Sequence, residues 1–119
     1  MENREDILKV KSYAFALRIV KLYKFLTMEL KEYVLSKQLL RCGTSIGANV
    51  AEAGQAQSKA DFVHKLSISL KESAETQYWI ELLRDGEFLN VDQAESILVD
   101  CREIQRILTA SIKTAKTKR

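Results

Sequence analysis

Apolar residues recur along this chain at alternating spacings of three and four, in four successive stretches separated by short breaks. This period is typical of amphipathic α-helices. It predicts helices over residues 4–29, 34–56, 59–85 and 92–115. Four helices with short connections favour one all-α domain spanning residues 1–119, folded as an antiparallel up-down-up-down four-helix bundle.

Residues at the breaks support these boundaries. Ser58 precedes the third stretch as a candidate N-cap, and Gly86 follows that stretch as a candidate stop signal. Asn90 or Asp92 is expected to cap the fourth helix. The first break, near Leu30–Tyr33, contains neither glycine nor proline. Its turn is therefore predicted only from the loss of phase in the apolar pattern.

Two of the predicted helices carry a second apolar face in addition to the face that builds the core. A single small bundle would leave these second faces in water, which monomeric proteins generally avoid. We therefore predict a homo-oligomer with these residues as subunit contacts. In the first helix they are Val10, Tyr13, Leu17 and Val20, and in the third they are Ile68, Trp79 and Leu82.

The second helix divides into three arcs when wound at 100° per residue. One arc is an apolar core stripe that includes Leu39, Cys42 and Ile46. Another contains Gly43 and Gly47, and each mid-helix glycine costs about 1 kcal/mol relative to alanine. Close packing of another helix on this bare face would compensate for that cost, so both glycines are predicted to be close-packing positions.

The third arc of the second helix is entirely polar. We predict that its residues, joined by a glutamate of the next helix, form a partly buried polar seam in which Arg41 pairs with Glu52 or Glu75. The alternative interpretation is a surface for a ligand or nucleic acid. The predicted polar seam consists of Arg41, Ser45, Asn49, Glu52 and Glu75.

A net charge of +3 permits contact with RNA or DNA but does not argue for it. Two basic strips are candidates for such contacts. The simpler interpretation is a solvated helix face for the strip of the first helix, and cations that favour the helix dipole for the strip near the C-terminus. Aromatic residues do not interleave with these cations, so a base-stacking platform is unsupported. One strip consists of Arg102, Arg106, Lys113, Lys116, Lys118 and Arg119, and the other of Lys11, Arg18 and Lys21.

Residue patterns typical of catalysis are weak. Asp61 and His64 have the spacing used in di-iron bundles, but such sites need two histidines, and the chain has one. We therefore predict no catalytic site, metal or cofactor. Cys42 and Cys101 lie in apolar stripes and are predicted to be buried thiols in a reducing cytoplasm. The sequence lacks a signal-peptide pattern and an apolar run of about 18–20 residues, which predicts a cytoplasmic protein without a membrane partner.

The stretch RCGTSIGANVAEAGQAQSKADFVHKLSISLKESAETQYWIELL, residues 41–83, resembles the bacterial four-helix-bundle family of 23S rRNA intervening-sequence proteins. The residues that carry this resemblance are Arg41, Ser45, Ile46, Asn49, Glu52, Gly54, Phe62 and Glu75. Two departures from the commonest pattern indicate a subgroup. Ala53 separates Glu52 from Gly54, and Lys71-Glu72 replaces a frequent Gly-Ser pair.

The resemblance implies a homopentamer that forms a five-fold ring around a central channel. We therefore expect a non-enzymatic, self-assembling scaffold. The family's link to genes inserted in ribosomal RNA supports an alternative, an RNA- or DNA-binding protein acting through basic faces of the oligomer. A similar bundle serves as the accessory protein of diversity-generating retroelements, which implies a reverse transcriptase as a further candidate partner.

Overall fold

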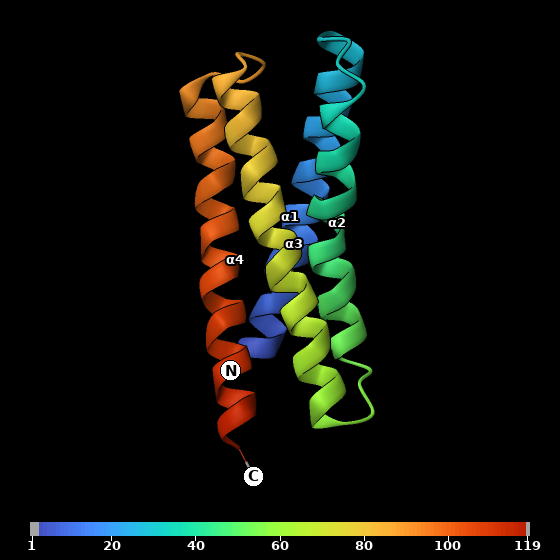
Figure 1. The fold of residues 1–119 in the computed structure, drawn as a ribbon, viewed down its shortest axis with the longest axis vertical. Coiled ribbons are helices and arrows are strands. Elements are labelled where there is room, and N and C mark those ends of the chain that lie inside the picture. Colours follow the sequence, from blue (N-terminus) through green and yellow to red (C-terminus); the bar gives the residue numbers. More distant parts are fainter. Residues whose placement is uncertain (1–2, 119) are drawn as a thin grey trace.

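The computed structural model describes residues 3–118, and within them the chain forms four α-helices. They are α1 (Arg4–Lys24), α2 (Leu35–Ala53), α3 (Lys59–Asp85) and α4 (Val91–Thr117), with a π-helical turn η1 (Phe25–Glu29) extending α1. The connections lie at alternating ends of the bundle, so each helix runs back along the one before it (Figure 1). The molecule is a rod of 50 × 23 × 22 Å. The predicted all-α bundle is confirmed.

Two helix ends differ from the sequence prediction. Helix α2 ends at Ala53 rather than at residue 56, because the α-helical hydrogen-bond pattern changes there. The N–H groups of Gln55 and Ala56 donate to the carbonyls three residues earlier instead of four, at 3.0 and 3.1 Å. Helix α4 runs to Thr117, two residues beyond the predicted end. Its N-cap is Asn90, which forms a reciprocal capping box with Gln93.

The connection between α1 and α2 is fixed by Glu32. Its carboxylate accepts hydrogen bonds from the backbone N–H groups of Val34, Leu35 and Ser36 at 3.0, 2.9 and 2.7 Å. Burial opposes the charge on Glu32, but these bonds and the Ser36 hydroxyl outweigh it and lower the pKa of the carboxyl. Lys31 adopts a left-handed conformation with φ of 56°, which turns the chain without a glycine. Glu32 is thus the N-terminal cap of α2.

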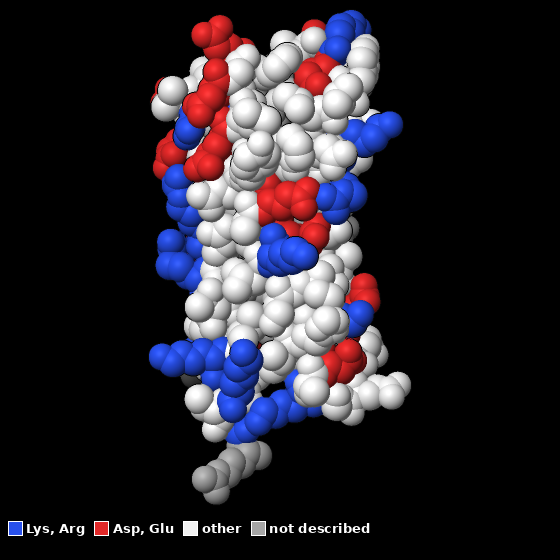
Figure 2. Space-filling model, in the orientation of Figure 1, with Lys and Arg blue, Asp and Glu red and all other residues white. Residues whose placement is uncertain are grey.

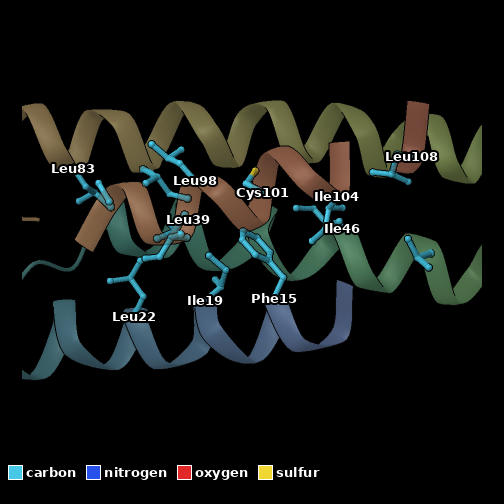
Figure 3. Close-up of a cluster of buried hydrophobic side chains, with 14 of the residues drawn as sticks. Phe15, Ile19, Leu22, Leu39, Ile46, Leu83, Leu98, Cys101, Ile104 and Leu108 are labelled. Carbon is cyan, nitrogen blue, oxygen red and sulfur yellow. The ribbon is translucent and has the colours of Figure 1, made fainter. Parts of the chain in front are cut away.

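The core runs along the axis of the bundle, and all four helices contribute to it (Figure 3). On α1 the core-facing stripe predicted by the apolar spacing comprises Leu8, Phe15, Ile19 and Leu22, and all four are buried. Helix α2 contributes Leu39 and Ile46, and α4 contributes Leu98, Ile104 and Leu108. No helix of the described chain is long and apolar enough to cross a membrane.

The buried face of helix α3 combines apolar residues with small hydroxyl-bearing ones. Its buried residues include Ser69, Ser73 and Thr76, between Leu66 and Ile80. The hydroxyls remain hydrogen-bonded to backbone carbonyls: those of Ser73 and Thr76 bond within α3, at 2.6 and 2.7 Å. Because these side chains are small, α3 packs closely on its neighbours, and the hydroxyls make the buried face look polar in the sequence.

Candidate functional site

The second apolar face of α1 points away from the bundle. Val10, Tyr13 and Leu17 are 61, 67 and 48 % exposed, while the opposite side of the same helix is buried. Val20, the fourth residue predicted for this face, is half-buried. We call Val10, Tyr13 and Leu17 the α1 outer face. Within the single chain it is an uncovered apolar stripe of two helical turns.

The residues of the second apolar face predicted for α3 differ in their exposure. Leu82 is exposed as predicted, together with Tyr78, and these two residues form what we call the α3 outer face. Ile68 and Trp79 are half-buried instead, and Trp79 packs against the core. The indole of Trp79 also donates to Glu75 Oε2 at 3.0 Å, one turn earlier on α3. Ile68 and Trp79 are therefore less available as subunit contacts than predicted.

The two glycines of α2 lie against α1, as the close-packing argument predicts. A Cβ atom added at Gly43 would lie 2.8 Å from Ile19 Cγ1 and 2.9 Å from its Cγ2. A Cβ atom added at Gly47 would lie 3.1 Å from the carbonyl oxygen of Ser12. Helix α1 therefore occupies the space that side chains at these positions would need.

The predicted polar seam exists only in part. Arg41 of α2 pairs with Glu75 of α3 at 2.5 Å, and with Glu72 at 3.4 Å. The Arg41 side chain is nevertheless 53 % exposed, so the group is a surface ion-pair cluster rather than a buried network. In Figure 2, acidic and basic side chains meet midway along the bundle, where α2 and α3 lie side by side.

The remaining seam residues do not join this cluster. Glu52 is exposed and pairs with Lys65 of α3 at 2.9 Å, so of the two predicted partners of Arg41 it is Glu75 that forms the pair. This hydrogen-bonded pair raises the pKa of Lys65. Asn49 donates to the Ser45 carbonyl at 2.9 Å within α2 and does not reach across to α3. The polar arc thus contributes two separate ion-pair sites and one bond within the helix.

Besides Lys65, sequence reasoning missed two residues that connect α2 with α3. Glu72 lies one turn from Glu75, and this spacing could have identified it as a second carboxylate for Arg41. Ser69 is fully buried and donates to the Ile46 carbonyl at 2.9 Å. A lone serine gives no sequence signal for such a bond, because serine is equally common at exposed positions.

The basic strip of α1 is largely neutralised by α4. Lys11 pairs with Glu103 at 2.8 Å, and Arg18 pairs with Asp100 at 2.7 Å. The hydrogen bond between Lys11 and Glu103 raises the pKa of the lysine and lowers that of the glutamate. Lys21 remains exposed. Lys11 and Arg18 therefore connect two helices, and the prediction of a basic strip at this place is corrected to a line of ion pairs.

The basic strip of α4 is uneven. Arg102 pairs with Glu95 at 2.8 Å. Arg106 and the three lysines nearer the end of the helix are exposed, and Arg119 lies outside the described residues. Figure 2 shows basic side chains gathered at the end of the bundle where the chain terminates, and acidic ones over the opposite end of α4. The positive charge of α4 is therefore concentrated in its last turns.

The two thiols are buried as predicted, with both cysteines at 0 % exposure. Burial raises the pKa of both, and that of Cys101 rises to about 12. Neither thiol is thus poised as a nucleophile. Across residues 3–118, His, Cys, Asp and Glu side chains form no group of three or more that could hold a metal ion.

Comparison with known proteins gives two matches and one negative result. The family model described as 23S rRNA-intervening sequence protein matches residues 5–110. A search of curated proteins finds no match. Among solved structures, the chain is similar to a protein with unknown function from the S23 ribosomal protein family of Bacteroides thetaiotaomicron. The TM-score is 0.93 and the sequence identity 56 %, over 93 % of this chain and 99 % of the other.

Proposed function

The chain belongs to the 23S rRNA-intervening sequence protein family, and from the faces that its bundle leaves uncovered we propose that it is a non-enzymatic protein that assembles with copies of itself. The observation that carries this proposal is the α1 outer face, where three large apolar side chains in two successive turns are about half exposed or more. Contiguous apolar surface of this kind is typical of protein–protein contacts.

The position of the two outer faces favours a ring. Helix α1 packs against α2 and α4, and α3 packs against the same two helices, so α1 and α3 lie diagonally across the bundle. Their outer faces therefore point in opposite directions. A two-fold contact joins one patch to its own copy and would leave the other face in water. Contact between the α1 outer face of one chain and the α3 outer face of the next covers both.

Each outer face also offers an aromatic anchor. Tyr13 lies on the α1 outer face and Tyr78 on the α3 outer face. Tyrosine is enriched at the centres of protein interfaces, because its large ring buries much apolar area while its hydroxyl can remain hydrogen-bonded. Head-to-tail contacts form a closed ring when the rotation between neighbours closes. The family resemblance implies that closure occurs at five copies.

Complementation between two variants tests this arrangement. Tyr13→Lys/Leu17→Lys disrupts the α1 outer face, and Tyr78→Lys/Leu82→Lys disrupts the α3 outer face. Each variant alone should be a monomer by light scattering. Because each keeps one intact face, an equimolar mixture should form a dimer and stop there. Val99→Lys is the matched control, since Val99 is a half-exposed apolar residue in the first half of α4, and it should assemble as wild type.

Retained assembly in either double variant would contradict the proposal. Two monomeric variants that do not combine would contradict the head-to-tail arrangement and favour a contact of one face with itself.

A second candidate function is nucleic-acid binding, favoured by the lysines in the last turns of α4. Lys113, Lys116 and Lys118 are exposed and form no salt bridge within the described chain. A ring would repeat them once per copy, so that weak phosphate contacts add up through avidity. Binding of this kind would be weakly selective for sequence and steeply weakened by salt.

Fluorescence anisotropy with a structured RNA, measured across a salt series, tests this candidate. Lys113→Gln/Lys116→Gln should weaken binding and flatten its salt dependence. Lys11→Gln/Arg18→Gln should change it much less, because both side chains already pair with carboxylates of α4. Equal effects of the two double variants would refute the assignment to α4. No binding at low salt would leave a protein partner, such as the reverse transcriptase implied by the family resemblance.

A further inference from the structure

Charged residues border the two outer faces in opposite order along the chain. On α1, Asp6 lies one turn before the outer face and Lys21 one turn after it. On α3, Lys71 lies before the outer face and Asp85 after it. All four side chains are exposed. The α1 outer face is therefore bordered by a negative and then a positive charge, and the α3 outer face by a positive and then a negative one.

The spacing of these positions is nearly the same on the two helices. Each series begins with a charged residue and continues with a tyrosine seven residues later, a leucine four residues after that, and a second charge in the next turn. Steps of seven and four residues keep each series on one side of its helix. The end charges lie about 22 Å apart on α1 and about 21 Å apart on α3. The α1 series is Asp6, Tyr13, Leu17 and Lys21, and the α3 series is Lys71, Tyr78, Leu82 and Asp85.

We propose that these charges fix the direction and register of neighbouring chains, with Asp6 of one chain against Lys71 of the next and Lys21 against Asp85. This inference rests on the head-to-tail contact proposed above. When the two helices run parallel, the two tyrosines and the two leucines also lie opposite each other. In the antiparallel direction, Asp6 would meet Asp85 and Lys21 would meet Lys71. Like charges placed together at an interface disfavour the wrong arrangement.

The side chains that this register brings together differ in how free they are. Asp85 already pairs with Arg84 at 2.9 Å, so its contact with a partner's lysine should add less than the contact at the other end. Val10 falls opposite Glu75, whose carboxylate is already neutralised by Arg41. The three charged residues that form no salt bridge within the described chain are Asp6, Lys21 and Lys71.

The direction and the register have consequences for the shape of the assembly. Helices α1 and α3 run the same way within one chain, and both begin at the same end of the bundle, where Arg4 and Lys59 line one cleft (Figure 1). Parallel contact thus keeps all bundles of a ring pointing the same way. Within one chain Asp6 is level with about residue 61, so contact with Lys71 shifts the neighbour by about 15 Å along the bundle. Bundles in a closed ring are therefore inclined to its axis.

The two complementation variants isolate a single copy of this contact. We call the Tyr78→Lys/Leu82→Lys variant the α1 donor, because its α1 outer face is intact. We call the Tyr13→Lys/Leu17→Lys variant the α3 donor for the corresponding reason. Their mixed dimer contains one contact between an α1 and an α3 outer face, and titration with a fluorescently labelled chain gives its dissociation constant.

Charge reversal in this dimer tests the register. Asp6→Lys in the α1 donor should raise the dissociation constant about fivefold at low salt, because it faces a lysine, and Lys71→Glu in the α3 donor should do the same. With both substitutions present, opposite charges meet again, and the constant should return to within about twofold of its starting value. Asp6→Lys in the α3 donor is the matched control. It makes the same change to the first turn of α1 on a face without a partner, so the affinity should stay unchanged.

Each other result overturns the inference in a recognisable way. A dimer strengthened by Asp6→Lys in the α1 donor would indicate the antiparallel direction. Equal affinities throughout, or a loss that the second substitution does not restore, would show that Asp6 and Lys71 do not meet. If the two donors form no dimer before any charge is changed, the head-to-tail proposal itself fails, and the register fails with it.

Discussion

Replacing Gly43 with alanine tests the closest contact between α1 and α2. The added carbon would lie 2.8 and 2.9 Å from two γ-carbons of Ile19, which is fully buried and stiff at χ1. Overpacking costs about 1–3 kcal/mol, and two contacts below 3.0 Å place this case near the upper end. Alanine regains about 1 kcal/mol of helix propensity. The net loss of about 2 kcal/mol should lower the melting temperature by about 8 °C.

Thermal and urea unfolding at fixed protein concentration measure this loss, and a second background tests its cause. Ile19→Ala alone should cost about 2–5 kcal/mol, but it removes the clashing atoms. In that background Gly43→Ala should stabilise the protein, which reverses the sign of its effect. Gly54→Ala is the control, since Gly54 is exposed with φ of −64°, and it should be neutral or stabilising. A Gly43→Ala protein that melts at or above the wild-type temperature would refute the close approach of α1.

Three further predictions concern stability and reactivity. Glu32→Gln should lose about 1–2 kcal/mol at neutral pH through its weaker cap. Because the pKa of Glu32 lies below its ordinary value of 4.5, wild type should keep this advantage above that pH and lose it as the pH falls through the folded-state pKa, which urea unfolding across pH can follow. A double-mutant cycle between Arg41 and Glu75 should give a coupling of about 1 kcal/mol or less, since Arg41 is half exposed; a coupling near 3 would indicate a buried pair. Cys42 and Cys101 should resist a thiol reagent at pH 8 until the protein unfolds, because both are buried and their pKa values are raised; rapid labelling of native protein would contradict this.

The sequence predicts the helices and most of the core because both depend on local periodicity. The core stripe of α1 and the glycine contact of α2 follow from residue spacing alone. The cap of α2 could not be predicted in this way. Glu32 caps from two residues before the N-cap position, and it reaches the amides only because Lys31 turns the chain with a positive φ. Such a cap depends on backbone geometry that no local pattern specifies.

The polar contacts between helices were less predictable for a related reason. Spacing places Arg41 and Glu52 on the same arc of α2, but it does not say which residues of α3 lie opposite each of them. The axial offset between α2 and α3 decides this, and it pairs Arg41 with Glu75 and Glu52 with Lys65. The burial of Ser69 and Thr76 on α3 could not be predicted from an apolar pattern, because both side chains are polar and their hydroxyls bond to backbone carbonyls.

Sedimentation equilibrium of the wild-type protein at micromolar concentration tests the central proposal of self-assembly most directly. A ring that covers both outer faces should sediment as a single species several times the chain mass of 13.6 kDa. Five copies, as the family resemblance implies, correspond to about 68 kDa. A single species at 13.6 kDa would contradict the proposal, because the α1 outer face would then remain in water.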